Sequence, residues 1–101
     1  MPIPEIIEVD LRTLHLPPSR RQGADPFKLA LQISRHRNSL AGMPLPWVIR
    51  GKDGKVRIQD GVTRATRAAQ LLPGQLIRVE VISTMPNLYV ARCPTIGDLL
   101  P

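Results

Sequence analysis

Prolines constrain this chain more than any other feature. Eleven of its 101 residues are proline, and they are spread along the whole length. Proline cannot donate a backbone hydrogen bond and interrupts helices and central strands, so long helices are not expected. A chain of this length is close to the commonest size of a single domain. The sequence therefore predicts one small domain over residues 1–101, assembled from short elements.

The apolar residues are mostly aliphatic. Hydrophobic residues make up 43% of the chain, but only three are aromatic: Phe27, Trp47 and Tyr89. The core is therefore expected to consist of Leu, Ile, Val and Ala. We predict that Trp47 belongs to this core and does not act as a stacking platform for a base. No window approaches the roughly 18 apolar residues of a membrane-spanning helix, so no membrane partner is expected.

Hydrophobic patterning predicts the order strand, helix, strand, strand, helix, strand. The expected elements are a strand over 3–11, a helix over 26–40 that starts at Asp25-Pro26, hairpin strands over 47–49 and 56–58 around an Asp-Gly turn, a helix over 62–72 and a strand over 75–83. This order indicates a small α/β or α+β domain. Its core is expected over residues 6–82, and the tail over 83–101 is either a short turn of helix or loose.

The first predicted helix is amphipathic and ends in basic residues. Four residues fall near one stripe, as in helices that pack by an apolar side: Phe27, Ala30, Leu31 and Ser34. Arg35 and Arg37 at its end complement the helix dipole. They are candidates for binding nucleic-acid phosphates, and a solvated helix end is the alternative.

The charge balance is strongly basic. The net charge is +6, and eleven of the fourteen basic residues are arginine. The planar guanidinium suits bidentate binding of phosphates and carboxylates. The composition favours an anionic partner, namely a nucleotide, a nucleic acid or an acidic protein. A general preference for arginine over lysine is the alternative explanation.

Cysteine and histidine offer little for catalysis or metal binding. Cys93 is the single cysteine, so an internal disulfide and a cysteine metal cluster are excluded. It is expected to be a small packed thiol or a loosely exposed one. His15 and His36 lack nearby ligand residues in the sequence, so no metal site is expected. The N-terminus lacks the basic start and apolar run of a secretory signal, and a cytoplasmic location is predicted.

Residues 58–74, IQDGVTRATRAAQLLPG, carry the strongest functional pattern. A strand ends at Gly61 and a helix begins, which leaves the first backbone N–H groups of the helix without partners. These groups and the helix dipole favour an anion. Thr63 adds a hydroxyl, Arg64 lies in the first turn, and Arg67 follows along the same face. The alternative is a plain strand–turn–helix with solvated arginines.

Several pieces of the chain, taken in order, resemble the ParB/sulfiredoxin fold family. They are the loop LPPSRR, the segment Gly42-Met-Pro-Leu-Pro46-Trp-Val48, the turn Asp60-Gly61-Val-Thr-Arg64 and the strand Ile77-Arg-Val79-Glu-Val81. The resemblance spans residues 6–82. It implies a stand-alone ParB N-terminal-like domain of the α+β class, with a mixed sheet and two main helices.

The resemblance also implies a nucleotide site. ParB-like proteins hold the phosphates of CTP at the matching turn, and sulfiredoxins hold ATP there. By position, Gly61, Thr63 and Arg64 would seat the phosphates of CTP or ATP, with or without Mg²⁺. Two other regions would complete the site. Gly42 would line the opposite wall, and Arg20 or Arg21 in the first loop would add positive charge.

The chain departs from both branches of this family. The sulfiredoxin cysteine is replaced by Val62 and the histidine after it by Thr63, so sulfinic-acid reduction is not expected. Neither residue supplies the acidic and basic pair that follows the glycine in ParB proteins. Any hydrolysis of the nucleotide is therefore expected to be weak, and no catalytic residue is assigned. The DNA-binding and dimerisation domains of partition proteins are not expected from a chain that ends at Pro101.

Two other functions stay open. The first is a basic DNA-binding or nuclease-like protein of the ParB type. A metal-dependent nuclease needs clustered carboxylates, whereas Asp60 is the only acidic residue next to the turn, where it could equally cap the second helix. The second is a non-catalytic module that binds another protein.

Overall fold

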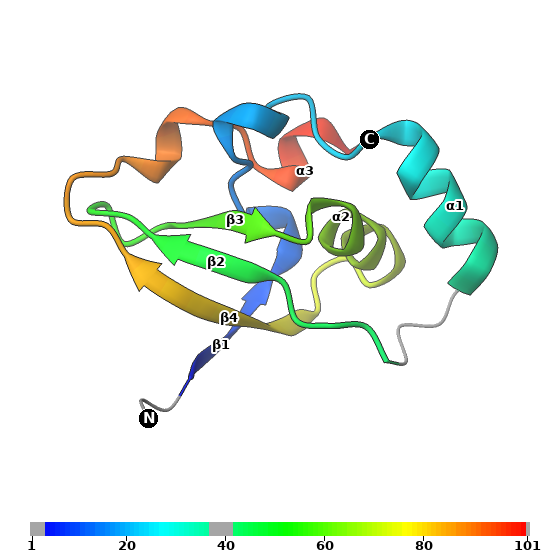
Figure 1. Ribbon diagram of the computed structural model, residues 1–101, viewed down its shortest axis with the longest axis horizontal. Helices are drawn as coiled ribbons and strands as arrows, with labels where there is room; N and C mark the ends of the chain where they lie inside the picture. Colours follow the sequence, from blue (N-terminus) through cyan, green and yellow to red (C-terminus); the bar gives the residue numbers. More distant parts are fainter. Residues whose placement is uncertain (1–3, 37–41, 101) are drawn as a thin grey trace.

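A computed structural model of the protein describes residues 4–36 and 42–100. The elements, in chain order, are β1 (Glu5–Asp10), η1 (Leu11–Thr13), η2 (Pro18–Arg20), α1 (Pro26–His36), β2 (Trp47–Arg50), β3 (Val56–Asp60), α2 (Val62–Leu71), β4 (Leu76–Thr84), η3 (Val90–Arg92) and α3 (Ile96–Leu99). They form one α+β unit, as the sequence predicts (Figure 1). The predicted positions 37–40 of the first helix lie outside the described residues.

The four strands form one mixed sheet in the order β1-β4-β2-β3. β4 pairs antiparallel with β1 and parallel with β2, and β2 pairs antiparallel with β3. The β2–β3 hairpin forms around the expected Asp-Gly turn, where Gly54 has a φ of 76° and its N–H donates to the carbonyl oxygen of Gly51 over 3.1 Å. A positive φ favours glycine at this position.

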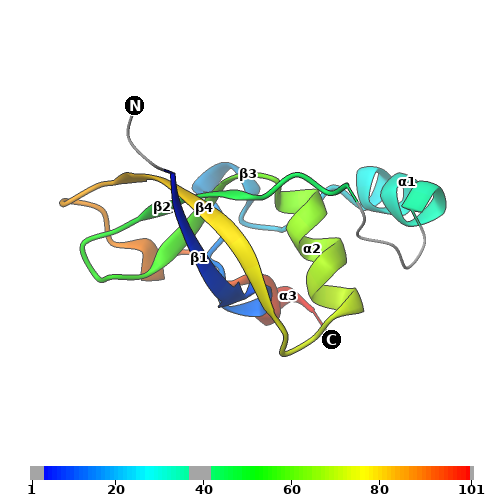
Figure 2. The same cartoon turned by 90° about the horizontal axis from the view of Figure 1, so that it is seen from below.

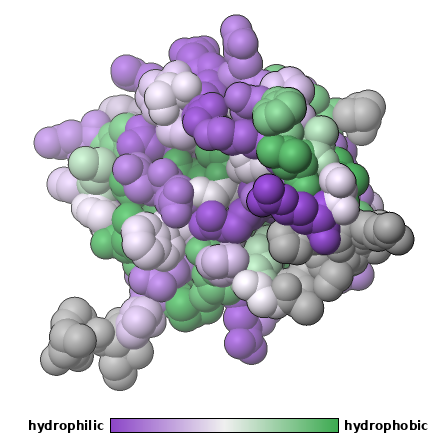
Figure 3. Space-filling view, turned by 45° about the vertical axis from the view of Figure 1, so that its right-hand side comes forward, coloured by the Kyte–Doolittle hydropathy of each residue, from purple (hydrophilic) through white to green (hydrophobic). Residues whose placement is uncertain are grey.

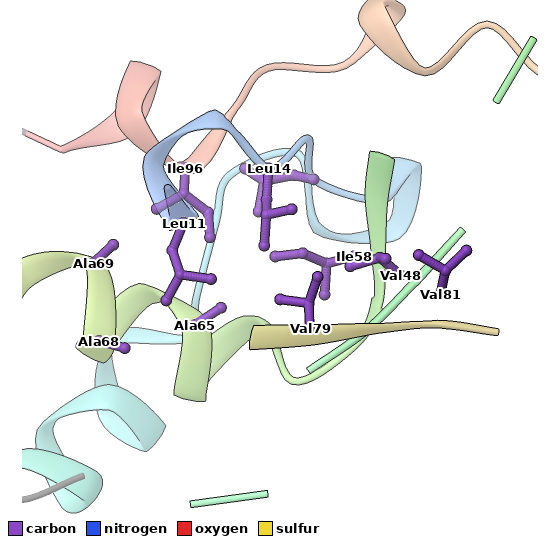
Figure 4. Close-up of a cluster of buried hydrophobic side chains, with 11 residues drawn as sticks. Leu11, Leu14, Val48, Ile58, Ala65, Ala68, Ala69, Val79, Val81 and Ile96 are labelled. Atoms are coloured by element: carbon purple, nitrogen blue, oxygen red, sulfur yellow. The ribbon is translucent and has the colours of Figure 1, made fainter. Parts of the chain in front are cut away.

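The core lies between the sheet, α2 and the segments that follow β1 and β4. In Figure 1, α3 and the orange segment that contains η3 lie over one side of the sheet, and α2 lies at its end. The buried cluster is aliphatic, as expected, and Figure 4 shows how its side chains converge: Leu11, Leu14, Leu16, Val48, Ile58, Ala65, Ala68, Ala69, Val79, Val81 and Ile96. The prediction that Trp47 belongs to the core is wrong, because its side chain is 46% exposed.

The C-terminal tail is part of this core. Ile96 and Cys93 are buried, which resolves the alternatives left by the sequence in favour of a packed thiol and an ordered tail. The N–H of Ile96 donates to the carbonyl oxygen of Leu14 over 2.9 Å, and the N–H of Leu16 donates to that of Pro94 over 2.8 Å. The core therefore extends beyond the expected boundary at residue 82.

Helix α1 is packed with its apolar stripe outward. It lies beyond α2, away from the sheet (Figures 1 and 2). Phe27 is 72% exposed and Leu31 is 39% exposed, and Ala30 and Ser34 are also exposed. Its start follows the sequence, since Asp25 Oδ1 accepts from the N–H of Phe27 over 2.8 Å. The apolar stripe of α1 is therefore exposed, although its sequence pattern is typical of a helix whose apolar side is packed.

Among the described residues, none of the helices combines the length and the apolar character that crossing a lipid bilayer requires.

Candidate anion-binding cleft at the start of α2

The connection between β3 and α2 is a single residue, Gly61. It is the N-cap of α2 with a φ of 101° and a ψ of 26°, and the helix start has no hydrogen bond from a capping side chain among the described residues. The first intrahelical bond runs from the N–H of Ala65 to the carbonyl oxygen of Gly61, over 2.8 Å. The N–H groups that precede Ala65 in the helix are the donors that a helix start leaves without intrahelical partners.

The loop after η1 is fixed beside this helix start by backbone pairing with β3. The N–H of His15 donates to the carbonyl oxygen of Val56 over 3.1 Å, and the carbonyl oxygen of His15 accepts from the N–H of Ile58 over 2.9 Å. The bridge between His15 and Arg57 is parallel. The chain therefore runs along β3 toward Gly61 and brings η2, with Arg20, next to the start of α2.

A cleft of about 600 Å³ opens between η2, the start of α1, the end of β3 and the start of α2. Its lining contains four cationic residues and two acidic ones, and these are Arg20, Lys28, Arg57, Arg64, Asp25 and Asp60. On the face of the molecule in Figure 3, hydrophilic side chains in purple cross the middle of the surface. The cleft has the size of many small-ligand sites.

Arg64 folds back over the turn instead of extending into solvent. Its Nη2 lies 3.3 Å from Asp60 Oδ2, and a Cβ on Gly61 would lie 2.9 Å from the same Nη2. Asp60 therefore pairs with Arg64 and does not cap the helix, which settles the alternative that the sequence left open. A guanidinium beside a helix N-terminus meets the positive end of the dipole, so this arrangement favours an additional anion.

Arg57 is a cleft residue that the sequence analysis missed. Its Nε is buried and has no hydrogen-bond partner among the described residues, and the same is true of the Nε of Arg64. A buried donor without a partner costs about 1–3 kcal/mol. The signal was present in strand alternation, because Arg57 and Gln59 flank the buried Ile58 and therefore share the opposite face of β3.

The cations of the cleft outnumber the acids that could neutralise them. Asp25 accepts from the N–H groups of Phe27 and Lys28 at the start of α1, and Asp60 pairs with Arg64. Within residues 4–36 and 42–100, the side chains of Arg20, Lys28 and Arg57 form no ion pair. The cleft is therefore an electropositive region that an anionic group would stabilise.

The structure brings together four of the residues proposed from the sequence, which are Arg20, Gly61, Thr63 and Arg64. Gly42 is exposed and does not line the cleft, so the expected opposite wall is formed instead by η2 and α1. Arg21 lines an adjoining depression that shares Arg20 with the cleft.

Arg67 and the basic end of α1 do not line the cleft. Arg67 is only 3% exposed and interacts within the protein, so it does not follow Arg64 along the cleft as expected. The helical turn places it toward the interior, among the buried alanines of α2. Arg35 lies exposed near the end of α1, and Arg37 lies outside the described residues.

No three side chains among His, Cys, Asp and Glu come close enough to hold a metal ion in the part of the chain that the structure describes. The cleft therefore offers an ion such as Mg²⁺ only single carboxylates, of which Asp60 is the one at the helix start.

Comparisons with known proteins found no match to this chain among protein-family models, curated proteins or solved structures.

Proposed function

We propose that this protein binds a nucleoside triphosphate, CTP or ATP, with its phosphates at the start of α2. The observation that carries the proposal is the combination of a helix start without a side-chain cap and a cleft with four cationic residues in front of it. Each feature alone is common in proteins. Together they place backbone donors, a helix dipole and guanidinium groups around one volume, which is how proteins bind phosphates.

The phosphates would be held by the N–H groups of the first turn, the Thr63 hydroxyl and the guanidinium groups of Arg57 and Arg64. Arg64 must exchange Asp60 for phosphate oxygens, or bind both. A surface pair of this i,i+4 type contributes only about 0.3–0.5 kcal/mol, so a multiply charged phosphate group can displace it. Arg20 and Lys28 complete the positive rim.

The rest of the cleft is suited to sugar and base contacts of low selectivity. Its lining includes the amides of Gln32 and Gln59 and the rings of Pro17 and Pro18, but no aromatic side chain. Without an aromatic ring for stacking, most of the affinity must come from the phosphates. We therefore expect a triphosphate to bind much more tightly than the corresponding nucleoside, and CTP and ATP to differ less.

A bound Mg²⁺ would have to be held mainly by phosphate oxygens, as is usual for this ion, with Asp60 as the protein carboxylate within reach of the helix start. Weak hydrolysis would follow if such an ion positioned a water, and no residue is assigned as a catalytic base. The cytoplasm, where nucleoside triphosphates are abundant, is the location that fits this proposal.

A thermal-shift screen of the four nucleoside triphosphates, with and without Mg²⁺, tests the proposal. A ligand at 100 times its dissociation constant should add roughly 2.7 kcal/mol to the free energy of unfolding. Arg64→Ala should remove most of this gain. Arg78→Ala is the matched control, since Arg78 lies on β4 and 73% of its side chain is exposed. A melting temperature that no triphosphate raises would refute nucleotide binding.

A second candidate function is binding to the phosphate backbone of a nucleic acid. It is favoured by the depression of about 610 Å³ next to the cleft, which adds Arg21 to Arg20, and by the exposed Arg35 on α1. If this function is correct, the affinity for single-stranded or duplex DNA should fall steeply between low and moderate salt. Fluorescence anisotropy of a labelled oligonucleotide over a salt series distinguishes this function from nucleotide binding.

A further inference from the structure

The apolar side of α1 faces away from the rest of the protein. Among the described residues, α1 packs mainly against α2, and residues such as Leu29 and Gln32 on its inner side are partly buried. Phe27 is 72% exposed on the outer side and Leu31 is 39% exposed. Among residues 4–36 and 42–100, the outer stripe of this 11-residue helix is therefore left largely uncovered.

The pattern of this surface is that of a helix that packs against another helix. Phe27 and Leu31 are four residues apart, as are Ala30 and Ser34, so each pair lies on the same side of the helix one turn apart. The large pair offers anchor groups, while the small pair allows a second backbone to approach closely. Helix recognition in grooves and on helix faces uses this spacing.

The charges beside the stripe determine which kind of helix can dock. α1 contains no acidic residue, and Lys28 and Arg35, seven residues apart, lie along one border of the stripe. In an antiparallel pair of two copies, Lys28 of one copy would face Arg35 of the other, and like charges would repel. A helix with acidic residues beside its apolar positions would instead form ion pairs along the same border.

We propose that the outer face of α1, formed by Phe27, Ala30, Leu31 and Ser34, is a docking surface for an acidic amphipathic helix of another protein. The role of this face goes beyond nucleotide binding and does not depend on it, because none of these four residues lines the cleft, although Lys28 borders both the face and the cleft. A lipid surface is a poorer fit, because Ala30 and Ser34 in this face add little apolar area to that of Phe27 and Leu31, and Ile33, which is 45% exposed, lies outside the stripe.

Selection from a displayed library of helical peptides of about 16 residues, roughly 24 Å long when helical, tests this proposal. The library is panned against the full chain in the presence of inorganic tripolyphosphate, which competes with acidic peptides for the cationic cleft. We expect enriched peptides to carry net negative charge and apolar residues at spacings of three and four. Phe27→Ser and Leu31→Ser should each weaken their binding by roughly tenfold.

The matched control is Ile82→Ser, since Ile82 on β4 is 42% exposed and lies far from α1 in sequence. Circular dichroism melting shows that each variant is folded, and Ala30→Arg provides a second variant that blocks close approach while it retains both anchor residues. Weaker peptide binding in all three α1 variants, with the control unchanged, supports the proposal.

Three results would overturn the proposal. The enriched peptides could bind Phe27→Ser as tightly as the unmodified protein, or none could be enriched. The chain could dimerise through α1, which sedimentation would reveal as self-association that Phe27→Ser abolishes. It could bind phosphatidylserine vesicles, but no peptide, through Phe27 and Leu31, and the face would then be a membrane contact.

Discussion

The starts of α2 and α3 have opposite designs. At α3, Thr95 Oγ1 accepts from the N–H of Asp98 over 3.1 Å, and the Asp98 carboxylate accepts from the N–H of Thr95 over 2.9 Å. This reciprocal capping box satisfies donors and places a negative charge at the positive end of the dipole. At α2 the cap is Gly61, which brings no side chain, and a guanidinium lies over it.

The difference shows that the missing cap belongs to α2 in particular and is not a general feature of the helix starts in this protein. The protein caps α1 with Asp25 and α3 with Thr95, so capping side chains are present at the starts of both other α-helices in the described residues. Of the three α-helices in the described residues, α2 is the one that combines an uncapped start with cations around it. An external anion at that position would do what Asp98 does at α3.

The largest expected effect comes from Gly61→Ala. A Cβ there would lie 2.9 Å from Arg64 Nη2 and 3.3 Å from the Cα of Pro46, and the φ of 101° strains any other residue. We expect a loss of about 2–3 kcal/mol in the free energy of unfolding, measured in urea, together with loss of triphosphate binding. Gly74→Ala, whose Cβ meets nothing within 4 Å, is the control for the backbone strain alone. Equal losses in the two variants would show that the turn is not closely packed.

Arg57→Met should separate stability from binding. It removes a buried Nε that has no partner among the described residues and keeps an unbranched side chain of similar volume. We expect the free energy of unfolding without ligand to stay the same or rise by about 1 kcal/mol. The triphosphate affinity, measured by isothermal titration calorimetry, should fall by roughly tenfold. A destabilised variant with unchanged affinity would assign Arg57 to the fold instead of the site.

Thr95→Ala is the complementary change at α3. Loss of the N-cap hydroxyl should reduce the free energy of unfolding by about 1 kcal/mol. The stabilisation by a triphosphate should stay as large as in the unmodified protein, because α3 does not line the cleft. A smaller ligand effect in this variant would mean that the two helix starts are coupled.

The smallest expected effect is on the pH dependence of stability. The Thr95 N–H lowers the pKa of Asp98, and the hydrogen bond from Arg50 lowers the pKa of Glu5. A carboxyl with a lowered pKa stabilises the folded state above its unfolded pKa of about 4, and the gain is lost as the pH falls through the folded pKa. Asp98→Asn and Glu5→Gln should each flatten the fall in stability below about pH 5. A pH profile identical to that of the unmodified protein would rule out these contributions.

Local patterns in the sequence predicted most of the fold. Hydrophobic alternation predicted the four strands, the Asp-Gly turn predicted the hairpin, and Asp25-Pro26 predicted the start of α1. These features could be predicted because each is determined by residues that are neighbours in the sequence. The burial of α1 and of Trp47 was predicted wrongly. An apolar stripe shows that a helix face should be covered, but only tertiary packing decides whether this chain covers it.

The candidate site was predictable in part for the same reason. Gly61, Thr63 and Arg64 are close in sequence, and the turn that joins them is a local feature. Lys28 and Arg57 come from different elements, and they line one cleft only because α1 packs against α2, at the end of β3. The position of Arg67 was predicted wrongly, because the exposed and the buried side of α2 differ by only a small angle around the helix axis.

The most direct test of the central claim is an amide NMR titration with CTP, ATP and inorganic tripolyphosphate. If phosphates bind at the start of α2, the N–H signals of Val62, Thr63 and Arg64 should shift in a saturable way, and those of the α3 start should stay in place. Unchanged signals in α2 at saturating ligand, or shifts confined to other parts of the protein, would contradict the account.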